Sequence, residues 1–322
     1  MKAYKGFNAD MTCRGFQFEE GKTYEHEGEV KLCESGFHAC EDPLDIFGYY
    51  APSGSEFHEV ELEGVSDEYK EETKVVAKKI TIGARLGIDK IIKACVEFRF
   101  SKLEKELKNS GDNDVASNSG DYGAASNSGY KGLASNSGNK GAASNSGDYG
   151  AASNSGNKGL ASNSGYKGLA SNSGNNGAAS NSGYKGLASN SGYKGLASNS
   201  GDYGAASNSG DYGAASNSGN NGAASNSGYK GAASNSGDYG AASNSGYNGA
   251  AETSGKHSIA ISVGYDSKAR GALGTWIVLA ERDEWDGEGY PIKDVRAFKV
   301  DGEQVKADTW YKLVNGVLIE TK

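Results

Sequence analysis

Long apolar runs are missing from this sequence of 322 residues. No stretch approaches the roughly 18 consecutive apolar residues that a membrane-spanning helix needs. The first ten residues, MKAYKGFNAD, also lack the apolar core of a secretion signal. We therefore expect a soluble protein of the cytoplasm, with no membrane partner.

An excess of positive charge is missing as well. The chain has 33 Lys and Arg against 41 Asp and Glu, which gives a net charge of −8. Residues 109–251 hold seven Asp and seven Lys, so the middle of the chain is neutral. Binding to nucleic acid needs a basic face, and mimicry of DNA needs a dense acidic face. We therefore expect neither a nucleic-acid partner nor a DNA mimic.

Cysteine is scarce, and the four cysteines, Cys13, Cys33, Cys40 and Cys95, all lie in the first 95 residues. In a chain without a secretion signal, reduced thiols are expected rather than disulfides. Cys33, His38 and Cys40 in CESGFHAC could hold zinc together with Cys13, but they lack the CxxC spacing that is typical of zinc sites. Buried thiols fit this pattern better. We predict no metal and no cofactor.

One short motif is abundant instead. The pentapeptide ASNSG recurs every nine residues, and its asparagine occupies fifteen positions from Asn118 to Asn244. Two variable residues and a second glycine follow each motif, which predicts a tight turn in which the glycines supply positive φ angles. A disordered linker needs only a composition, whereas here each position is fixed. The fixed period indicates a β-solenoid with coils stacked about 4.8 Å apart.

Nine residues supply one strand and one turn, which cannot close a coil. Two units make a flattened coil of about eighteen residues with two parallel sheets back to back, so each unit should stack on the unit two positions later. Calcium-binding nonapeptide repeats have a similar period, but they need an aspartate in every turn. Here aspartate occupies only some turns, as at Asp121 and Asp148. We therefore expect a solenoid without calcium.

Strand alternation places Ala125 and Asn127 on one face and the serines on the other. We favour alanine and asparagine inside, since stacked amides can hydrogen-bond one another. This assignment predicts an asparagine ladder that includes Asn127, Asn136, Asn145, Asn154, Asn163, Asn172 and Asn181. The opposite assignment has support in HSIAISVG, where Ile259 and Ile261 take the places of the outer residues. The sequence leaves both assignments open.

Tyrosines occupy many of the turns. The candidates for a binding edge are Tyr122, Tyr130, Tyr149 and Tyr166. Stacked rings can simply brace the turns, whereas regularly spaced aromatics beside charged residues also suit recognition of a protein partner. Association between copies of the chain is a further possibility.

The two ends of the chain have ordinary, varied sequences. Residues 1–108 combine alternating strands such as FHEVELEGV with a short helix that begins at Asp42 and Pro43, which predicts an α+β domain. Residues 109–274 form the solenoid. Residues 275–322 read as a small β-rich cap, with a hairpin expected at Asp301-Gly302, and this cap covers the open end of the solenoid. The predicted fold class is mainly β.

The segments YKGFNADMTCRGFQFEEGKTY and CESGFHACEDPLDIFGYY resemble the N-terminal domain of an uncharacterised family of bacteriophages and gut bacteria. The segment GTWIVLAERDEWDGEGYPIKDVRAFKV resembles that family's closing segment, and the nonapeptides resemble its middle. This resemblance implies a phage or prophage setting and brings no established activity.

The order of YKG, GFHAC, a short helix and an alternating strand is also similar to that of ADP-ribosyltransferase-like domains. That resemblance implies a nicotinamide cleft lined by Tyr4, Gly6, Phe37 and His38. It puts Lys5 where the family has Arg or His, and it assigns no catalytic glutamate.

These patterns together predict a non-enzymatic structural or interaction protein whose solenoid is a rigid spacer or a binding surface for a protein partner. A transferase domain carried on a repeat spacer is one alternative. A phage decoy or mimic that binds a host protein is another.

Overall fold

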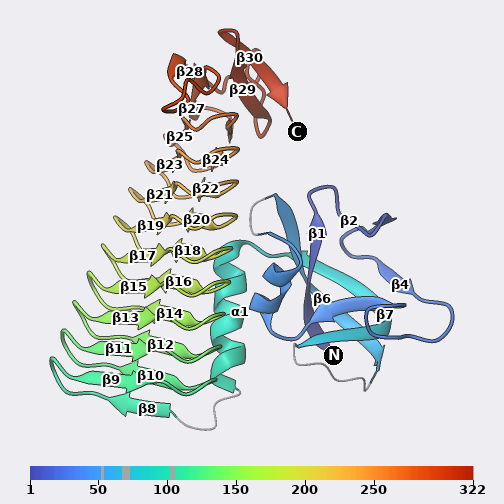
Figure 1. Cartoon of the computed structure of the whole chain (residues 1–322), viewed down its shortest axis with the longest axis vertical. Helices are drawn as coiled ribbons and strands as arrows, with labels where there is room; N and C mark the ends of the chain where they lie inside the picture. The colour runs from blue at the N-terminus through green and yellow to red at the C-terminus, as the bar shows by residue number, and fades with distance from the viewer. Residues whose placement is uncertain (52–53, 67–72, 102–105, 322) are drawn as a thin grey trace. The chain divides into compact units, whose positions relative to one another are not determined.

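The computed structural model describes residues 1–51, 54–66, 73–101 and 106–321. Strands account for 47% of the chain and helix for 5%, so the mainly-β prediction is confirmed. The chain forms two compact units, Met1–Leu103 and Glu104–Lys322 (Figure 1). The second unit begins before the predicted boundary at residue 109, because strand β8 (Glu106–Asn109) already pairs in parallel with a repeat strand.

The N-terminal unit is built on one antiparallel sheet. Its strands are β1 (Lys2–Asn8), β2 (Thr12–Cys13), β3 (Phe16–Gln17), β4 (Thr23–Glu25), β5 (Phe37–Cys40), β6 (Ser55–Val65) and β7 (Lys74–Arg85). Five of them form a sheet in the order β4-β7-β5-β1-β6, and β6 pairs with β7 as well, so four strands close into a small barrel. The alternation in β6 turns Val60 and Leu62 into the barrel, where they pack in one apolar cluster with Phe7 and Ile80.

Two helical segments complete this unit. A 3-10 helix, η1 (Pro43–Gly48), begins as the sequence predicts: the Asp42 carboxylate accepts a hydrogen bond from the Leu44 amide at 3.0 Å, and Pro43 occupies the first turn. The α-helix α1 (Ile88–Ser101) follows β7. Among the described residues, no helix is long and apolar enough to cross a membrane.

The repeats form a β-solenoid of about nine turns with roughly 18 residues per turn, as predicted. One sheet consists of β8, β10 (Ala124–Asn127), β12 (Ala142–Asn145), β14 (Leu160–Asn163), β16 (Ala178–Asn181), β18 (Leu196–Asn199), β20 (Ala214–Asn217), β22 (Ala232–Asn235), β24 (Ala250–Thr253) and β26 (Lys268–Gly271), followed by β29 (Trp310–Val314) and β30 (Val317–Thr321). The other consists of β9 (Val115–Asn118), β11 (Leu133–Asn136), β13 (Ala151–Asn154), β15 (Leu169–Asn172), β17 (Leu187–Asn190), β19 (Ala205–Asn208), β21 (Ala223–Asn226), β23 (Ala241–Asn244), β25 (Ile259–Ser262), β27 (Trp276–Arg282) and β28 (Ile292–Lys299).

Each repeat strand pairs in parallel with the strand two units later, so that identical residues lie over one another, as Asn127 lies beside Asn145. The alanine at the second strand position is buried along the array, and the asparagine at the fourth is buried from Asn127 to Asn244, whereas Asn118 in the first repeat is half-buried. Ile259 and Ile261 are only partly buried, and Ala260 between them is fully buried. Alanine and asparagine therefore face inward, which decides between the two assignments that the sequence leaves open.

The turn glycines do not play the predicted role. The positive φ falls on the second variable residue, for example 55° at Tyr122 and 51° at Lys167, and not on the bracketing glycines. Those glycines are required because the chain leaves no room for a side chain. A Cβ on Gly165 would lie 2.0 Å from the carbonyl oxygen of Gly147 in the coil below, and a Cβ on Gly168 would overlap the side chain of Asn163. Close approach between coils, rather than backbone conformation, selects glycine here.

The cap continues both sheets of the solenoid. Strand β27 pairs in parallel with β25 on one side and antiparallel with β28 on the other. Strands β29 and β30 form a hairpin next to β26. The predicted hairpin at Asp301-Gly302 is wrong, because the Asp301 carboxylate instead accepts hydrogen bonds from the amides of Glu303 and Val305 at 2.9 Å and holds a loop. This loop places Val305 in the apolar core of the cap.

Candidate functional site

The N-terminal unit contains a cavity of about 640 Å³. Strands β1 and β5 lie side by side at its wall, with Tyr4 opposite Cys40. The cavity is lined by all four residues of the predicted cleft, namely Tyr4 and Gly6 from β1 and Phe37 and His38 from β5. The structure thus brings these four residues together around one space of a size that suits a small molecule.

Gly6 is needed at this wall for a steric reason. A Cβ at this position would lie 2.6–2.9 Å from the Cβ, Cγ and Cδ2 atoms of Tyr50, which also lines the cavity. The ring of Tyr50 therefore packs directly on the backbone of β1. Burial raises the pKa of the Tyr50 hydroxyl, so this group stays protonated at neutral pH.

His38 is held as a neutral imidazole. Its Nε2 atom accepts a hydrogen bond from the Cys33 amide at 2.7 Å, so this nitrogen carries no proton. Burial, together with the charges of Lys74, Lys5 and Arg14, lowers the pKa of His38 to about 4. The three cations therefore lie close enough to act on one imidazole.

Lys5 is the buried cation of the cavity. The residue is only 6% exposed, and its Nζ donates a hydrogen bond to the His38 carbonyl oxygen at 2.8 Å. The same nitrogen lies 3.7 Å from the sulfur of Cys13 and 5.5 and 5.7 Å from the ring centres of Phe7 and Phe18. Burial lowers the pKa of this ammonium. In the motif resemblance Lys5 is only a departure from the Arg or His of the family. Its place between Tyr4 and Phe7 in a buried strand is the sequence signal for a buried cation.

None of the four cysteines forms a disulfide, and two of them lie beside lysines. Besides the contact of Cys13 with Lys5, the Nζ of Lys74 lies 3.4 Å from the sulfur of Cys33. In the part of the chain that the structure describes, no group of three or more His, Cys, Asp or Glu side chains is placed to hold a metal ion.

The asparagine ladder of the solenoid is built differently from the prediction. The amide nitrogen of each predicted residue donates to a turn carbonyl 13 residues earlier, as Asn181 does to Gly168 at 2.8 Å. For most of them the amide oxygen accepts from the glycine amide two residues on, as in the 2.8 Å bond from Gly183 to Asn181. Direct amide-to-amide bonds join Asn199, Asn217 and Asn235. The asparagines mainly satisfy the buried backbone of the turns, which is a structural role.

The tyrosines of the turns form two columns. The first column, on the edge where the chain passes from the twelve-stranded to the eleven-stranded sheet, has ring centres 5.4–5.8 Å apart and comprises Tyr130, Tyr149, Tyr166, Tyr184 and Tyr203. The second column, on the opposite edge, has ring centres 5.1–5.6 Å apart and comprises Tyr193, Tyr212, Tyr229, Tyr247 and Tyr265. Tyr122 lies on the edge of the second column but outside it. The predicted binding edge is thus divided between two edges.

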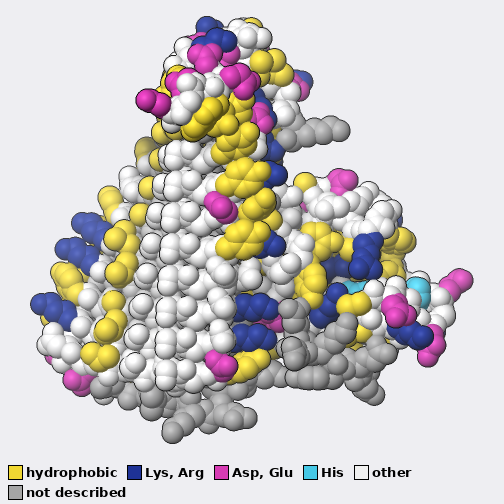
Figure 2. Space-filling model, in the orientation of Figure 1, with side chains coloured by type: hydrophobic (Ala, Val, Ile, Leu, Met, Phe, Trp, Pro, Cys, Tyr) yellow, Lys and Arg dark blue, Asp and Glu magenta, His cyan; other side chains and the backbone are white. Residues whose placement is uncertain are grey.

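The tyrosine rings of these columns are half-exposed, and lysines and aspartates of the turns lie beside them. The rings of the first column are 36–54% exposed, and Figure 2 shows columns of hydrophobic side chains with Lys beside them along the solenoid. The Nζ of Lys167 lies 5.4 and 5.3 Å from the ring centres of Tyr149 and Tyr166. Asp148 accepts a hydrogen bond from the Tyr166 amide in the next coil at 2.9 Å. Aspartates in the turns therefore join successive coils, while the tyrosines and lysines stay accessible.

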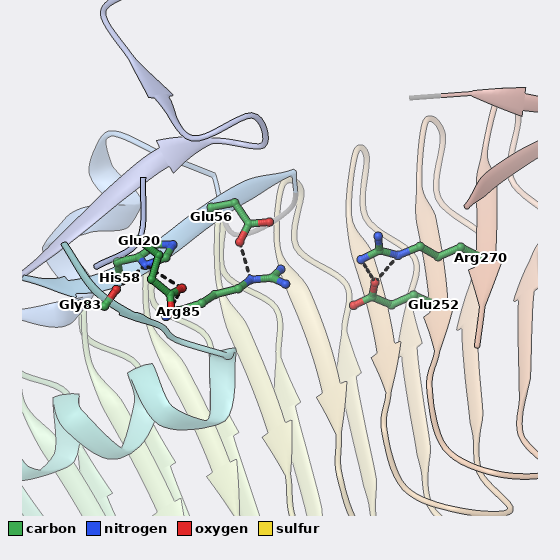
Figure 3. A network of polar contacts seen from close by, with 7 residues as sticks. All are labelled: Glu20, Glu56, His58, Gly83, Arg85, Glu252 and Arg270. Atoms are coloured by element: carbon green, nitrogen blue, oxygen red, sulfur yellow. Dashed lines mark hydrogen bonds and ion pairs between the residues drawn. The ribbon is translucent and has the colours of Figure 1, made fainter. Parts of the chain in front are cut away.

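Two further polar groups, one in each unit, are structural (Figure 3). In the N-terminal unit, His58 is 2% exposed and bonds the Gly83 carbonyl oxygen at 2.8 Å, and Arg85 pairs with Glu56. In the solenoid, Arg270 donates to Glu252 from Nε at 2.7 Å, at a position where earlier coils have serine over serine. These contacts join neighbouring strands, β6 with β7 in the N-terminal unit and β24 with β26 in the solenoid.

The fold and these surfaces define the class of protein as a β-solenoid repeat protein with an N-terminal domain that contains a cavity. Residues 1–94 match the model of a family described as a domain of unknown function (DUF7666). The match covers the N-terminal unit and not the repeats. Neither the comparison with curated proteins nor that with solved structures gives a match.

Proposed function

We propose that this protein is a non-enzymatic interaction protein whose solenoid acts as a rigid spacer and binds a protein partner along the first tyrosine column. The observation that carries the proposal is a continuous column of five half-exposed tyrosines beside accessible lysines. Tyrosine supplies a large contact area at a low cost in conformational entropy, and it is enriched at protein interfaces.

The interior of the solenoid supports a carrier role. Alanine methyl groups and asparagine amides fill it, and most of these amides bond the turn backbone. The polar groups of this interior are used in contacts that hold the coils together, whereas the edges repeat one exposed pattern over many coils. Solenoids with regular outer surfaces commonly present them to partners.

A tyrosine variant tests this proposal. The phage or prophage setting implied by the sequence resemblance makes a bacterial lysate the source of partners. A protein captured by the wild type and identified by mass spectrometry is purified, and its affinity for the chain is measured directly. Tyr149→Ser/Tyr166→Ser/Tyr184→Ser should weaken this binding at least tenfold, because it removes the centre of the first column. The control Tyr122→Ser/Tyr239→Ser, outside both columns, should bind like the wild type. Equal binding by the triple variant and the wild type would refute the proposal.

A transferase activity is the second candidate, because Tyr4, Gly6, Phe37 and His38 line one cavity. Glu59 does not line this cavity, and its carboxylate pairs with Lys2 at 2.9 Å. Glu34 is the one carboxylate among the described residues of the lining. Binding without transfer is therefore the better-supported role for the N-terminal unit. Transfer of label from NAD to proteins of a cell extract, lost in Tyr4→Phe, would establish the alternative.

A further inference from the structure

Among the described residues that line the cavity of the N-terminal unit, cations outnumber carboxylates. Lys5, Arg14 and Lys74 all line it, and the one described carboxylate of the lining is Glu34. Among the residues that the structure describes, none of these three cations forms an ion pair with a carboxylate. The cavity is therefore electropositive although the chain as a whole carries a net charge of −8.

The burial of Lys5 makes this excess of positive charge unfavourable for the stability of the unit. Its ammonium is enclosed by the rings of Phe7 and Phe18, and its nearest polar partners are a carbonyl oxygen at 2.8 Å and a thiol sulfur at 3.7 Å. A buried charge with neutral partners loses hydration that these partners replace only in part. A bound anion would restore that lost interaction. If Lys5 served only to fill this space, an apolar residue there would stabilise the unit more.

The other two cations lie where they can share the same anion. Lys74 contacts the sulfur of Cys33 at 3.4 Å and lies 4.5 Å from the ring centre of Tyr49. Arg14 occupies the left-handed region with φ of 50°, so the β2–β3 turn holds it in an uncommon conformation at the cavity. Lys5, Arg14 and Lys74 line the same cavity as His38.

Several aromatic side chains also line the cavity. Tyr4, Phe16, Phe37, Tyr49 and Tyr50 contribute to the wall, and Phe16 is 47% exposed. Aromatic walls favour a planar apolar group, while the three cations favour a doubly charged oxyanion over a singly charged one. The volume of about 640 Å³ accommodates both parts of such a molecule.

We propose that the N-terminal cavity binds a planar organic phosphate, with the phosphate held by Lys5, Arg14 and Lys74 and the planar group held between the aromatic side chains. This site is separate from the tyrosine columns and goes beyond the proposed function of the solenoid.

Calorimetry with the full chain tests the proposal with four probes. Phenyl phosphate carries both features, inorganic phosphate and phenol carry one each, and benzoate carries a single negative charge. We expect phenyl phosphate to bind at least tenfold more tightly than each of the other three. No binding of phenyl phosphate at millimolar concentration, or equal binding of phenol, would overturn the proposal.

Two variants locate the site. Lys5→Met should weaken the binding of phenyl phosphate at least tenfold, because it removes the buried charge and keeps an unbranched side chain that is only one atom shorter. The matched control is Lys2→Met, which changes an exposed lysine on the same strand and should leave affinity unchanged. If Lys5→Met does not fold, Lys74→Met should show the same loss. Affinity that is unchanged in both Lys5→Met and Lys74→Met would overturn the assignment of the phosphate to this cavity.

Discussion

The two units of this protein bury polar groups in opposite ways. In the solenoid, the buried polar side chains are mainly asparagine amides, and most of them bond the backbone of neighbouring turns. In the N-terminal unit, the ammonium of Lys5 is buried beside a neutral carbonyl oxygen and a thiol. The first arrangement stabilises the fold, whereas the second costs stability and is expected where a ligand binds.

The contrast extends to the surface of the two units. The solenoid repeats small residues inside and places its large side chains, the tyrosines, on the edges. The N-terminal unit places its aromatic side chains inside, around a cavity. Binding by the solenoid should therefore depend on many equivalent exposed residues, and binding by the N-terminal unit should depend on a few buried ones.

The largest effect is expected from filling the space between two coils. Gly165→Ala places a Cβ 2.0 Å from the carbonyl oxygen of Gly147, a backbone atom that cannot move away without opening the stack. We expect a loss of roughly 3 kcal/mol or more in the free energy of unfolding, from urea unfolding followed by circular dichroism. Gly289→Ala is the control, because a Cβ there meets no atom within 4 Å. Equal stability of the two variants would show that the coils are not in such close contact.

A smaller loss is expected when one asparagine of the ladder is replaced. Asn181→Leu leaves the amide of Gly183 and the carbonyl of Gly168 without their partner and adds bulk to a thin interior. We expect a cost of roughly 2–4 kcal/mol by the same urea assay. Tyr184→Ser alters a ring that is 43% exposed and should cost less than about 1 kcal/mol. The opposite order would mean that the exposed column, and not the ladder, stabilises the array.

The N-terminal unit should show a modest acid sensitivity. The pKa of His38 is about 4 in the folded protein against an ordinary value of 6.5. Between these pH values the unfolded chain binds a proton that the folded chain does not, so stability falls as the pH drops from 6.5 towards 4. Because His38 is only half-buried, solvent screening limits the effect to about 1 kcal/mol.

Native-state hydrogen exchange measures this sensitivity. The exchange rates of the β5 amides are corrected for intrinsic rates and compared between pH 7 and pH 5. His38→Gln keeps an acceptor for the Cys33 amide and removes the titration, so it should reduce the difference between the two pH values. An unchanged difference in His38→Gln would assign the acid sensitivity to another group.

The sequence predicts the solenoid well because its period is explicit. Coil length and parallel pairing follow from a spacing of nine residues. Strand alternation groups Asn127 with Ala125 but does not fix which face is inward, and the burial of both residues in the structure does. The partners of the asparagine amides do not follow, since several acceptors lie within reach of a stacked amide and only the turn geometry selects among them. The role of Gly165 was missed for a related reason: contact between coils is a property of the assembled stack, and a turn signal looks the same in either case.

The N-terminal cavity is only partly visible in the sequence. Tyr4, Gly6, Phe37 and His38 were grouped through a motif resemblance, and the structure brings them to one cavity. Lys74 lies far from them in the sequence and reaches the cavity because β7 pairs with β5. No local sequence pattern predicts this pairing. The positive charge of the cavity lining is therefore seen only once the topology of the sheet is known.

The stability of Lys5→Met without ligand tests the central contrast most directly. If the burial of this charge serves binding and not folding, the variant should melt at or above the temperature of the wild type in phosphate-free buffer, because an unbranched apolar side chain of similar length removes an uncompensated charge. Lys2→Met, an exposed change on the same strand, provides the baseline. A fall in melting temperature of roughly 5 °C or more relative to that control would contradict the account, since it would show that the Lys5 ammonium stabilises the fold as the asparagines of the solenoid do.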